Sequence, residues 1–123
     1  MIKNFALVAL GGGLGSILRY SCQKLFQLNF SGTFPLGTFL VNISGSILIG
    51  LLWGLSIRSA ALTENWKLVL MTGLCGGFTT FSAFSQESIS LLRDGKTNLF
   101  FLYVLGSVVL GLLATFYSFR LTQ

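Results

Sequence analysis

Four long apolar segments dominate this chain and restrict it to one kind of environment. They cover residues 3–27, 36–57, 67–92 and 98–120. A helix needs about 20 mostly apolar residues to cross the hydrocarbon core of a bilayer, and each segment is long enough. Only 9% of the residues are charged, against about 25% in a soluble domain. The sequence therefore predicts an all-α membrane protein with four transmembrane helices in a single domain, residues 1–123.

Charged residues are few, and almost all of them lie between the apolar segments or near their ends. There is no histidine, and the only acidic residues are Glu64, Glu87 and Asp94. This leaves too few groups for general acid–base chemistry or a metal cluster, so we expect no enzyme. The net charge of +5 comes from basic residues that can meet lipid head groups. Because no basic stripe accompanies this charge, it does not indicate nucleic-acid binding.

The short connections force neighbouring helices to run antiparallel, which places the basic residues on two sides of the membrane. One side carries Lys3, Arg58, Lys67 and Arg120, and the other carries Lys24, Arg93 and Lys96. This difference of one charge is too small to fix the orientation. Either another feature fixes it, or the chain inserts both ways and forms an antiparallel, dual-topology dimer. A subunit with four helices could hardly enclose a pore alone, which also favours a dimer.

Small residues recur at four-residue spacing in three of the segments. The pairs are Gly11 with Gly15, Ser46 with Gly50, Gly50 with Gly54, and Ser107 with Gly111. Such spacing lets helix backbones approach closely in lipid. The contacts could lie inside one bundle, or some of these faces could form a subunit interface.

The third segment contains a patch of glycine, threonine, serine and phenylalanine, residues 73–85. Hydrocarbon tolerates irregular backbone only where protein or a water-filled path covers it. We expect a helix break at Gly76-Gly77, which is either a close-packing kink or a source of free carbonyl groups. In the second case, the carbonyls of Gly76 and Thr79 from two subunits could cage a small monovalent cation.

Three phenylalanines, Phe78, Phe81 and Phe84, alternate with hydroxyl residues in this patch. Aromatic side chains in a membrane helix usually face lipid or the protein core. The interleaved hydroxyls favour a second interpretation, because the edge of a phenyl ring is positive. Phe81 and Phe84 could turn their edges toward a small anion that has lost part of its water.

Further polar residues lie inside the other segments. Asn42 is in the middle of the second segment, with Thr38 and Ser46 on the same face, and its amide either bonds a neighbouring helix or lines a pore as a donor. Tyr103 and Ser107 begin a weak polar track in the fourth segment, where both hydroxyls can donate to an anion.

Two charged residues also lie within the apolar segments. Arg19 either snorkels to the head groups or places a fixed positive charge near a pore mouth. Glu87 is the only acid near a membrane segment, and it is either solvated or paired with a basic residue.

Together these residues resemble the CrcB/Fluc family of fluoride channels over nearly the whole chain. The matching motifs are GGGLGSILRY (residues 11–20), PLGTFLVNISG (residues 35–45) and GLCGGFTTFSAF (residues 73–84). The resemblance implies a dual-topology antiparallel dimer with two pores in the inner (plasma) membrane, which exports fluoride passively and protects the cytoplasm. It maps the fluoride pore onto Asn42, Phe81, Phe84, Tyr103, Ser107 and Arg19. It also maps a structural Na⁺ at the dimer centre onto the carbonyls of Gly76 and Thr79.

Two positions depart from the family pattern. Ala83 stands where a threonine is frequent, and Gly111 stands where the polar track commonly ends in a hydroxyl. Each departure removes a possible anion ligand, so the chain could instead be one subunit of a heterodimeric channel. A small multidrug-type transporter is a weaker alternative, because such transporters need a carboxylate in the first helix and this one has only Arg19.

Overall fold

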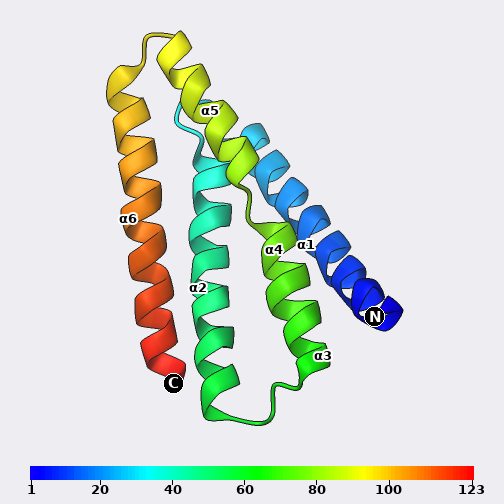
Figure 1. Cartoon of the computed structure of the whole chain (residues 1–123). Helices are drawn as coiled ribbons and strands as arrows, with labels where there is room; N and C mark the ends of the chain where they lie inside the picture. Colours follow the sequence, from blue (N-terminus) through cyan, green and yellow to red (C-terminus); the bar gives the residue numbers. More distant parts are fainter.

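A computed structural model describes all residues, 1–123, and it contains four helical spans arranged antiparallel (Figure 1). The first is α1 (Ile2–Asn29), the second is α2 (Leu36–Arg58) and the fourth is α6 (Thr97–Thr122). The third span, Glu64–Arg93, is built from several pieces. All four are long and apolar enough to cross a membrane, and their bounds lie within three residues of those expected. The prediction of four transmembrane helices is confirmed.

The third span changes its winding along its length and then breaks. It runs through α3 (Glu64–Lys67), the π-helix η1 (Leu68–Cys75), α4 (Gly76–Phe78) and α5 (Phe81–Arg93). Between α4 and α5, Thr79 and Thr80 have extended backbones, with ψ of 157° and 120°. Figure 1 shows the chain uncoiling at this point. The predicted break exists, therefore, but at Thr79–Thr80.

The expected position of the break, Gly76-Gly77, was wrong, because the helix continues through both glycines and Gly77 packs closely on α1. Gly76 is helical, with φ of −63° and ψ of −39°. A side chain at Gly77 would collide with the backbone of Gly12 on α1. The lack of a side chain at Gly77 therefore serves close helix packing, and the helix continues through both glycines.

The small-residue pairs mediate contacts inside this chain. A Cβ at Gly11 or Gly15 would strike backbone atoms of the third span, and a Cβ at Gly50 or Gly54 would strike α6. In lipid, such close approach allows van der Waals packing of backbones without a hydrophobic drive. For these four glycines, packing within one bundle is the correct alternative.

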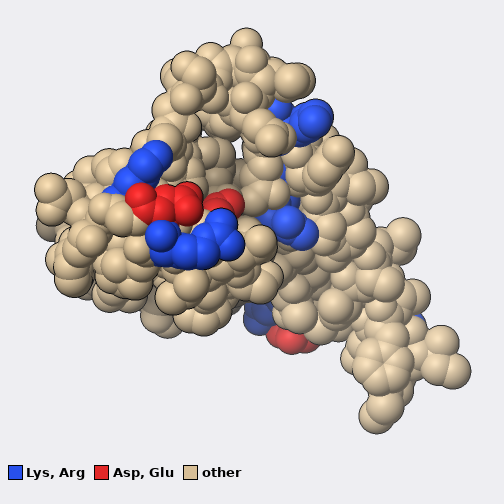
Figure 2. Space-filling model, turned by 90° about the horizontal axis from the view of Figure 1, so that it is seen from above, with Lys and Arg blue, Asp and Glu red and all other residues tan.

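Charged side chains occupy little of the molecular surface. Viewed from the end where α5 and α6 connect, the charged atoms form small groups among other residues (Figure 2). At this end Arg93 and Asp94 pair at 3.6 Å, and Gly95 takes a positive φ of 74° to turn the chain into α6. At the opposite end Lys67 bonds Glu64 at 2.7 Å. The two ion pairs thus lie at opposite ends of the bundle.

Candidate functional site

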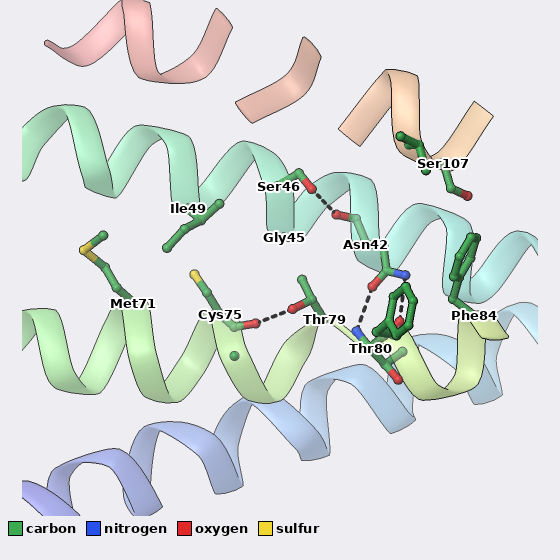
Figure 3. Close-up of a pocket in the computed structure, with 13 residues that line it drawn as sticks. Asn42, Gly45, Ser46, Ile49, Met71, Cys75, Thr79, Thr80, Phe84 and Ser107 are labelled. Carbon is green, nitrogen blue, oxygen red and sulfur yellow. Dashed lines mark hydrogen bonds between the residues drawn. The ribbon is translucent and has the colours of Figure 1, made fainter. Parts of the chain in front are cut away.

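The break in the third span is held by the side chain of Asn42 on α2. Its Nδ2 donates to the carbonyl of Thr80 at 3.0 Å, and its Oδ1 accepts from the N–H of Thr80 at 2.8 Å. Figure 3 shows this amide facing the broken segment. The two bonds satisfy backbone groups that the extended conformation removes from the helix, and such groups are costly to leave unpaired inside a membrane. Asn42 therefore makes the helix–helix hydrogen bond considered above, and one of its amide protons remains free.

The same arrangement leaves two backbone carbonyls without their helical donors. In a continuous α-helix the N–H of Thr80 would bond to the carbonyl of Gly76, but here it bonds to Asn42. Likewise, the N–H of Ala83 would bond to the carbonyl of Thr79, but it bonds to the hydroxyl of Thr80 at 3.2 Å. Gly76 and Thr79 are the two residues predicted to offer carbonyls to a cation.

Arg19 covers a third carbonyl beside the break. Its Nε donates to the carbonyl of Gly77 at 3.2 Å. The side chain therefore turns into the protein, onto α4, and does not snorkel toward the head groups. Its positive charge lies next to the broken segment.

A pocket of about 460 Å³ lies beside the break, between α2, the third span and α6 (Figure 3). Four of the predicted pore residues line it, namely Asn42, Phe81, Phe84 and Ser107, together with the predicted cation ligands Gly76 and Thr79. No carboxylate lines this pocket. Residues separated widely in sequence thus surround one space with amide, hydroxyl and phenyl groups.

The Ser107 hydroxyl is the one buried side-chain polar atom without a hydrogen-bond partner. Many other serines and threonines in this chain donate to a backbone carbonyl one turn back; Ser46 does so at 2.8 Å and Ser118 at 2.7 Å. A buried hydroxyl without an acceptor costs free energy. Ser107 therefore has a free donor at the pocket.

The two phenylalanines of the patch differ in their surroundings. Phe81 is 79% exposed in the single chain, although its ring approaches that of Phe84 with 5.7 Å between centroids. Phe84 packs against Tyr103 with a centroid distance of 5.1 Å. Phe84 is thus fixed by this chain alone, whereas most of Phe81 has no contact within the chain.

Tyr103 and Glu87 form a second polar group next to the pocket. Tyr103 is fully buried, does not line the pocket, and donates its hydroxyl proton to Oε2 of Glu87 at 2.7 Å. The other carboxylate oxygen, Oε1, accepts from Thr38 at 2.7 Å. Glu87 therefore bonds hydroxyl donors, and neither of the environments expected for it, free solvation or a basic partner, describes it.

The sequence alone predicts only part of this second polar group. Glu87 is the only acid well inside an apolar segment, and Thr38 lies on the polar face of Asn42. Gln23 on α1 completes the group by donating to Thr38 at 2.9 Å. Because Gln23 and Thr38 lie on different helices, their contact depends on packing and no local pattern could predict it.

Comparison with known proteins agrees with the motifs. The family described as "CrcB-like protein, Camphor Resistance (CrcB)" matches residues 6–119. A protein of Flavobacterium psychrophilum named "Fluoride-specific ion channel FluC" is 48% identical over 93% of this chain and 92% of its own length.

Two further relatives carry the same name. The protein from Phocaeicola vulgatus is 49% identical over 91% of this chain and 92% of its own length. The protein from Azobacteroides pseudotrichonymphae is 43% identical over 100% of this chain and 98% of its own length. With a family match over nearly the whole chain and relatives of this identity and coverage, the chain belongs to the CrcB family.

Proposed function

We propose that this chain is a fluoride-selective channel, which lets F⁻ leave the cell passively and so protects it from fluoride. The observation that carries the proposal is the buried Ser107 hydroxyl without an acceptor, at a pocket that holds amide and phenyl groups and no carboxylate. Fluoride is small and accepts hydrogen bonds strongly. The names of the relatives, fluoride-specific ion channels, support the same permeant ion.

The pocket suits an anion that has lost part of its water. Ser107 and the free amide proton of Asn42 donate hydrogen bonds, and the edges of Phe81 and Phe84 present partial positive charge. Arg19, next to the break, adds a positive potential that raises the local anion concentration. Tyr103 belongs to the proposed path as well, but its proton reaches fluoride only by leaving Glu87.

The working unit in this proposal is an antiparallel, dual-topology dimer in the inner (plasma) membrane, with two pores. Phe81 supports a second copy, because most of its ring lies uncovered beside the pocket. The nearly equal basic charge of the two ends supports insertion in both orientations. A partner chain of related sequence is the alternative to a second identical copy.

A structural Na⁺ at the centre of the dimer fits the carbonyls present in this chain. Gly76 and Thr79 each lack their helical donor, and both line the pocket. Carbonyl oxygens of this kind bind monovalent cations. The ion would supply positive charge that holds two inverted copies together, while Asn42 keeps the Gly76 carbonyl free by accepting from the N–H of Thr80.

The proposal is tested by fluoride efflux from liposomes that contain this chain alone, followed with a fluoride electrode. We expect fast release of fluoride and exclusion of chloride. If the chain alone releases nothing but conducts after co-expression with a related chain, it is a subunit of a heterodimer. If it releases fluoride only in exchange for protons or cations, it is a transporter.

The Phe81→Ile variant is expected to lower fluoride efflux about two- to tenfold while the dimer still assembles. Isoleucine keeps the apolar volume but has no positive ring edge, and one aromatic contact is worth about 0.5–1.5 kcal/mol. Efflux is measured per dimer after gel filtration. Ile89→Val on the same helix, an exposed residue outside the pocket, is the control. Wild-type efflux from Phe81→Ile would remove this ring from the path.

Removal of sodium tests the cation site. In liposomes prepared with N-methylglucamine as the only cation, we expect efflux to fall at least about tenfold and to return on addition of Na⁺. The carbonyls of Gly76 and Thr79 would then lack the positive charge that keeps them together. Equal efflux with and without sodium would exclude a required ion.

A further inference from the structure

We infer that Gln23 on α1 is a positioning residue for the fluoride path, although it lies outside the pocket. The inference rests on the proposed function and adds a residue to it. Gln23 is joined to the pocket by a series of hydrogen bonds and one ring contact that crosses four helices. The steps run from Gln23 to Thr38, Glu87, Tyr103 and Phe84.

The direction of each hydrogen bond follows from the chemistry of Glu87. An ionised carboxylate only accepts hydrogen bonds, so Thr38 must give its single hydroxyl proton to Glu87 across the 2.7 Å contact. Thr38 then has only acceptor capacity left for Gln23, whose Nε2 lies 2.9 Å away. The amide of Gln23 is therefore oriented with its NH₂ group toward Thr38.

The other end of the same amide agrees with this orientation. Its Oε1 faces the guanidinium of Arg19, with 3.5 Å between Nη1 and Oε1. This distance is at the outer limit of a hydrogen bond, but the opposite amide orientation would place two donors against each other. Arg19 and Thr38 thus favour the same orientation of Gln23 from opposite sides.

Close packing of α1 and α2 brings Gln23 within reach. A Cβ at Gly37, which precedes Thr38, would lie 3.3 Å from Cα of Gln23 and 3.4 Å from Cβ of Phe26. Thr38 is only 3% exposed. At this buried hydroxyl the amide of Gln23 occupies the acceptor side and leaves the Thr38 proton one direction, toward Glu87.

The far end of the series is the pocket itself. Glu87 is held by one proton from Thr38 and one from Tyr103. The fully buried ring of Tyr103 packs on Phe84, which lines the pocket. If Gln23 is lost, the Thr38 proton is free to rotate, and the carboxylate that fixes Tyr103 loses one of its two restraints.

The first test compares fluoride efflux of Gln23→Leu with that of Gln27→Leu. Gln27 is the matched control, because it lies one turn further along α1, is exposed, and makes no side-chain hydrogen bond in this chain. We expect Gln23→Leu to lower efflux about tenfold, as the loss of a part-buried hydrogen bond would, and Gln27→Leu to keep wild-type efflux. Equal efflux from both variants would overturn the inference.

The second test asks whether Gln23 acts through Thr38. In a Thr38→Val background, Gln23→Leu is expected to change efflux less than about twofold, because independent sites add whereas coupled sites do not. A further tenfold loss in that background would show a separate, structural role and reject the inference. If Gln23→Leu does not assemble, Gln23→Met replaces it in the same cycle.

The third test uses the charge of the substituent. Gln23→Glu retains length, but its carboxylate only accepts and would draw the Thr38 proton away from Glu87, so we expect efflux at least as low as in Gln23→Leu. Wild-type efflux from Gln23→Glu would contradict the inferred donor direction. Wild-type protein in the same assay separates the two proposals. No efflux from it, either alone or with a related chain, rejects the channel, whereas efflux from the Gln23 variants equal to that of a conducting wild type rejects only this inference.

Discussion

The Asn42→Asp variant is expected to lose about a thousandfold in fluoride efflux while it still assembles. The substitution keeps an acceptor for the N–H of Thr80 but removes the donor to the carbonyl of Thr80. It also places a negative charge at the proposed path of an anion. Two like charges about 4 Å apart repel by about 4 kcal/mol at an effective dielectric constant near 20, and each 1.36 kcal/mol on a barrier is tenfold in rate.

A comparison with Asn42→Ala separates the two roles of this residue. Alanine loses both bonds to Thr80 but brings no charge. If Asn42 acts mainly by holding the break, alanine is the more damaging change; if the field at the anion dominates, aspartate is. We expect aspartate to be the more damaging. Ser44→Ala on α2 is the control, since its exposed hydroxyl bonds only its own helix backbone.

Efflux is measured from liposomes at matched protein content, after gel filtration has established that each variant assembles. Residual efflux of Asn42→Asp within tenfold of wild type would mean that Asn42 contributes no donor to the fluoride path. Its contacts with Thr80 would then be purely structural.

The Gly15→Leu variant is expected to prevent folding of the bundle, with a cost of more than about 3 kcal/mol, at or beyond the upper end of usual overpacking effects. A Cβ at this position would strike the carbonyl oxygen of Leu74 and the backbone of Gly77 and Phe78. Backbone atoms cannot rotate aside as a flexible side chain can. The first and third spans would have to separate, and the break in the third span would lose its support on α1.

Gly13→Leu provides the matched control for this prediction. Gly13 is on the same helix, two residues earlier, and a Cβ there meets nothing within 4 Å. We expect Gly13→Leu to elute as wild type from gel filtration and to keep its melting temperature, whereas Gly15→Leu elutes as aggregate or gives no folded protein. A wild-type elution profile and melting temperature for Gly15→Leu would show that these helices are not closely packed.

The break in the third span was predictable from the sequence, but its exact position was not. The glycines at positions 76 and 77 suggested where the helix would stop, because glycine weakens helices locally. In the fold the helix runs through both glycines, with Gly77 packed against α1, and it stops at Thr79–Thr80 because Asn42, 38 residues earlier, takes over the hydrogen bonds of Thr80. The hydrogen bonds from Asn42, which is distant in sequence, decided the position of the break, and the local helix propensity of the glycines did not. The patch that contains the break, residues 73–85, was nevertheless recognisable from the sequence.

The residues of the candidate site were also predictable only in part. Asn42, Phe81, Phe84 and Ser107 were identified by their types and spacing, and all four line one pocket. Tyr103 was expected beside them as a free donor, but its proton goes to Glu87. A single sequence shows that a hydroxyl is present and does not show which acceptor it meets.

The sequence by itself determined the number of spans, their antiparallel order and the family, because hydropathy and motif spacing are properties of neighbouring residues. Only the tertiary structure decided where the third span opens and which carbonyls it frees. It alone also joined Gln23, Thr38 and Glu87 from three different helices. The physical reason is that a polar group inside a membrane must find a partner, and the helix that supplies it is chosen by how the backbones pack.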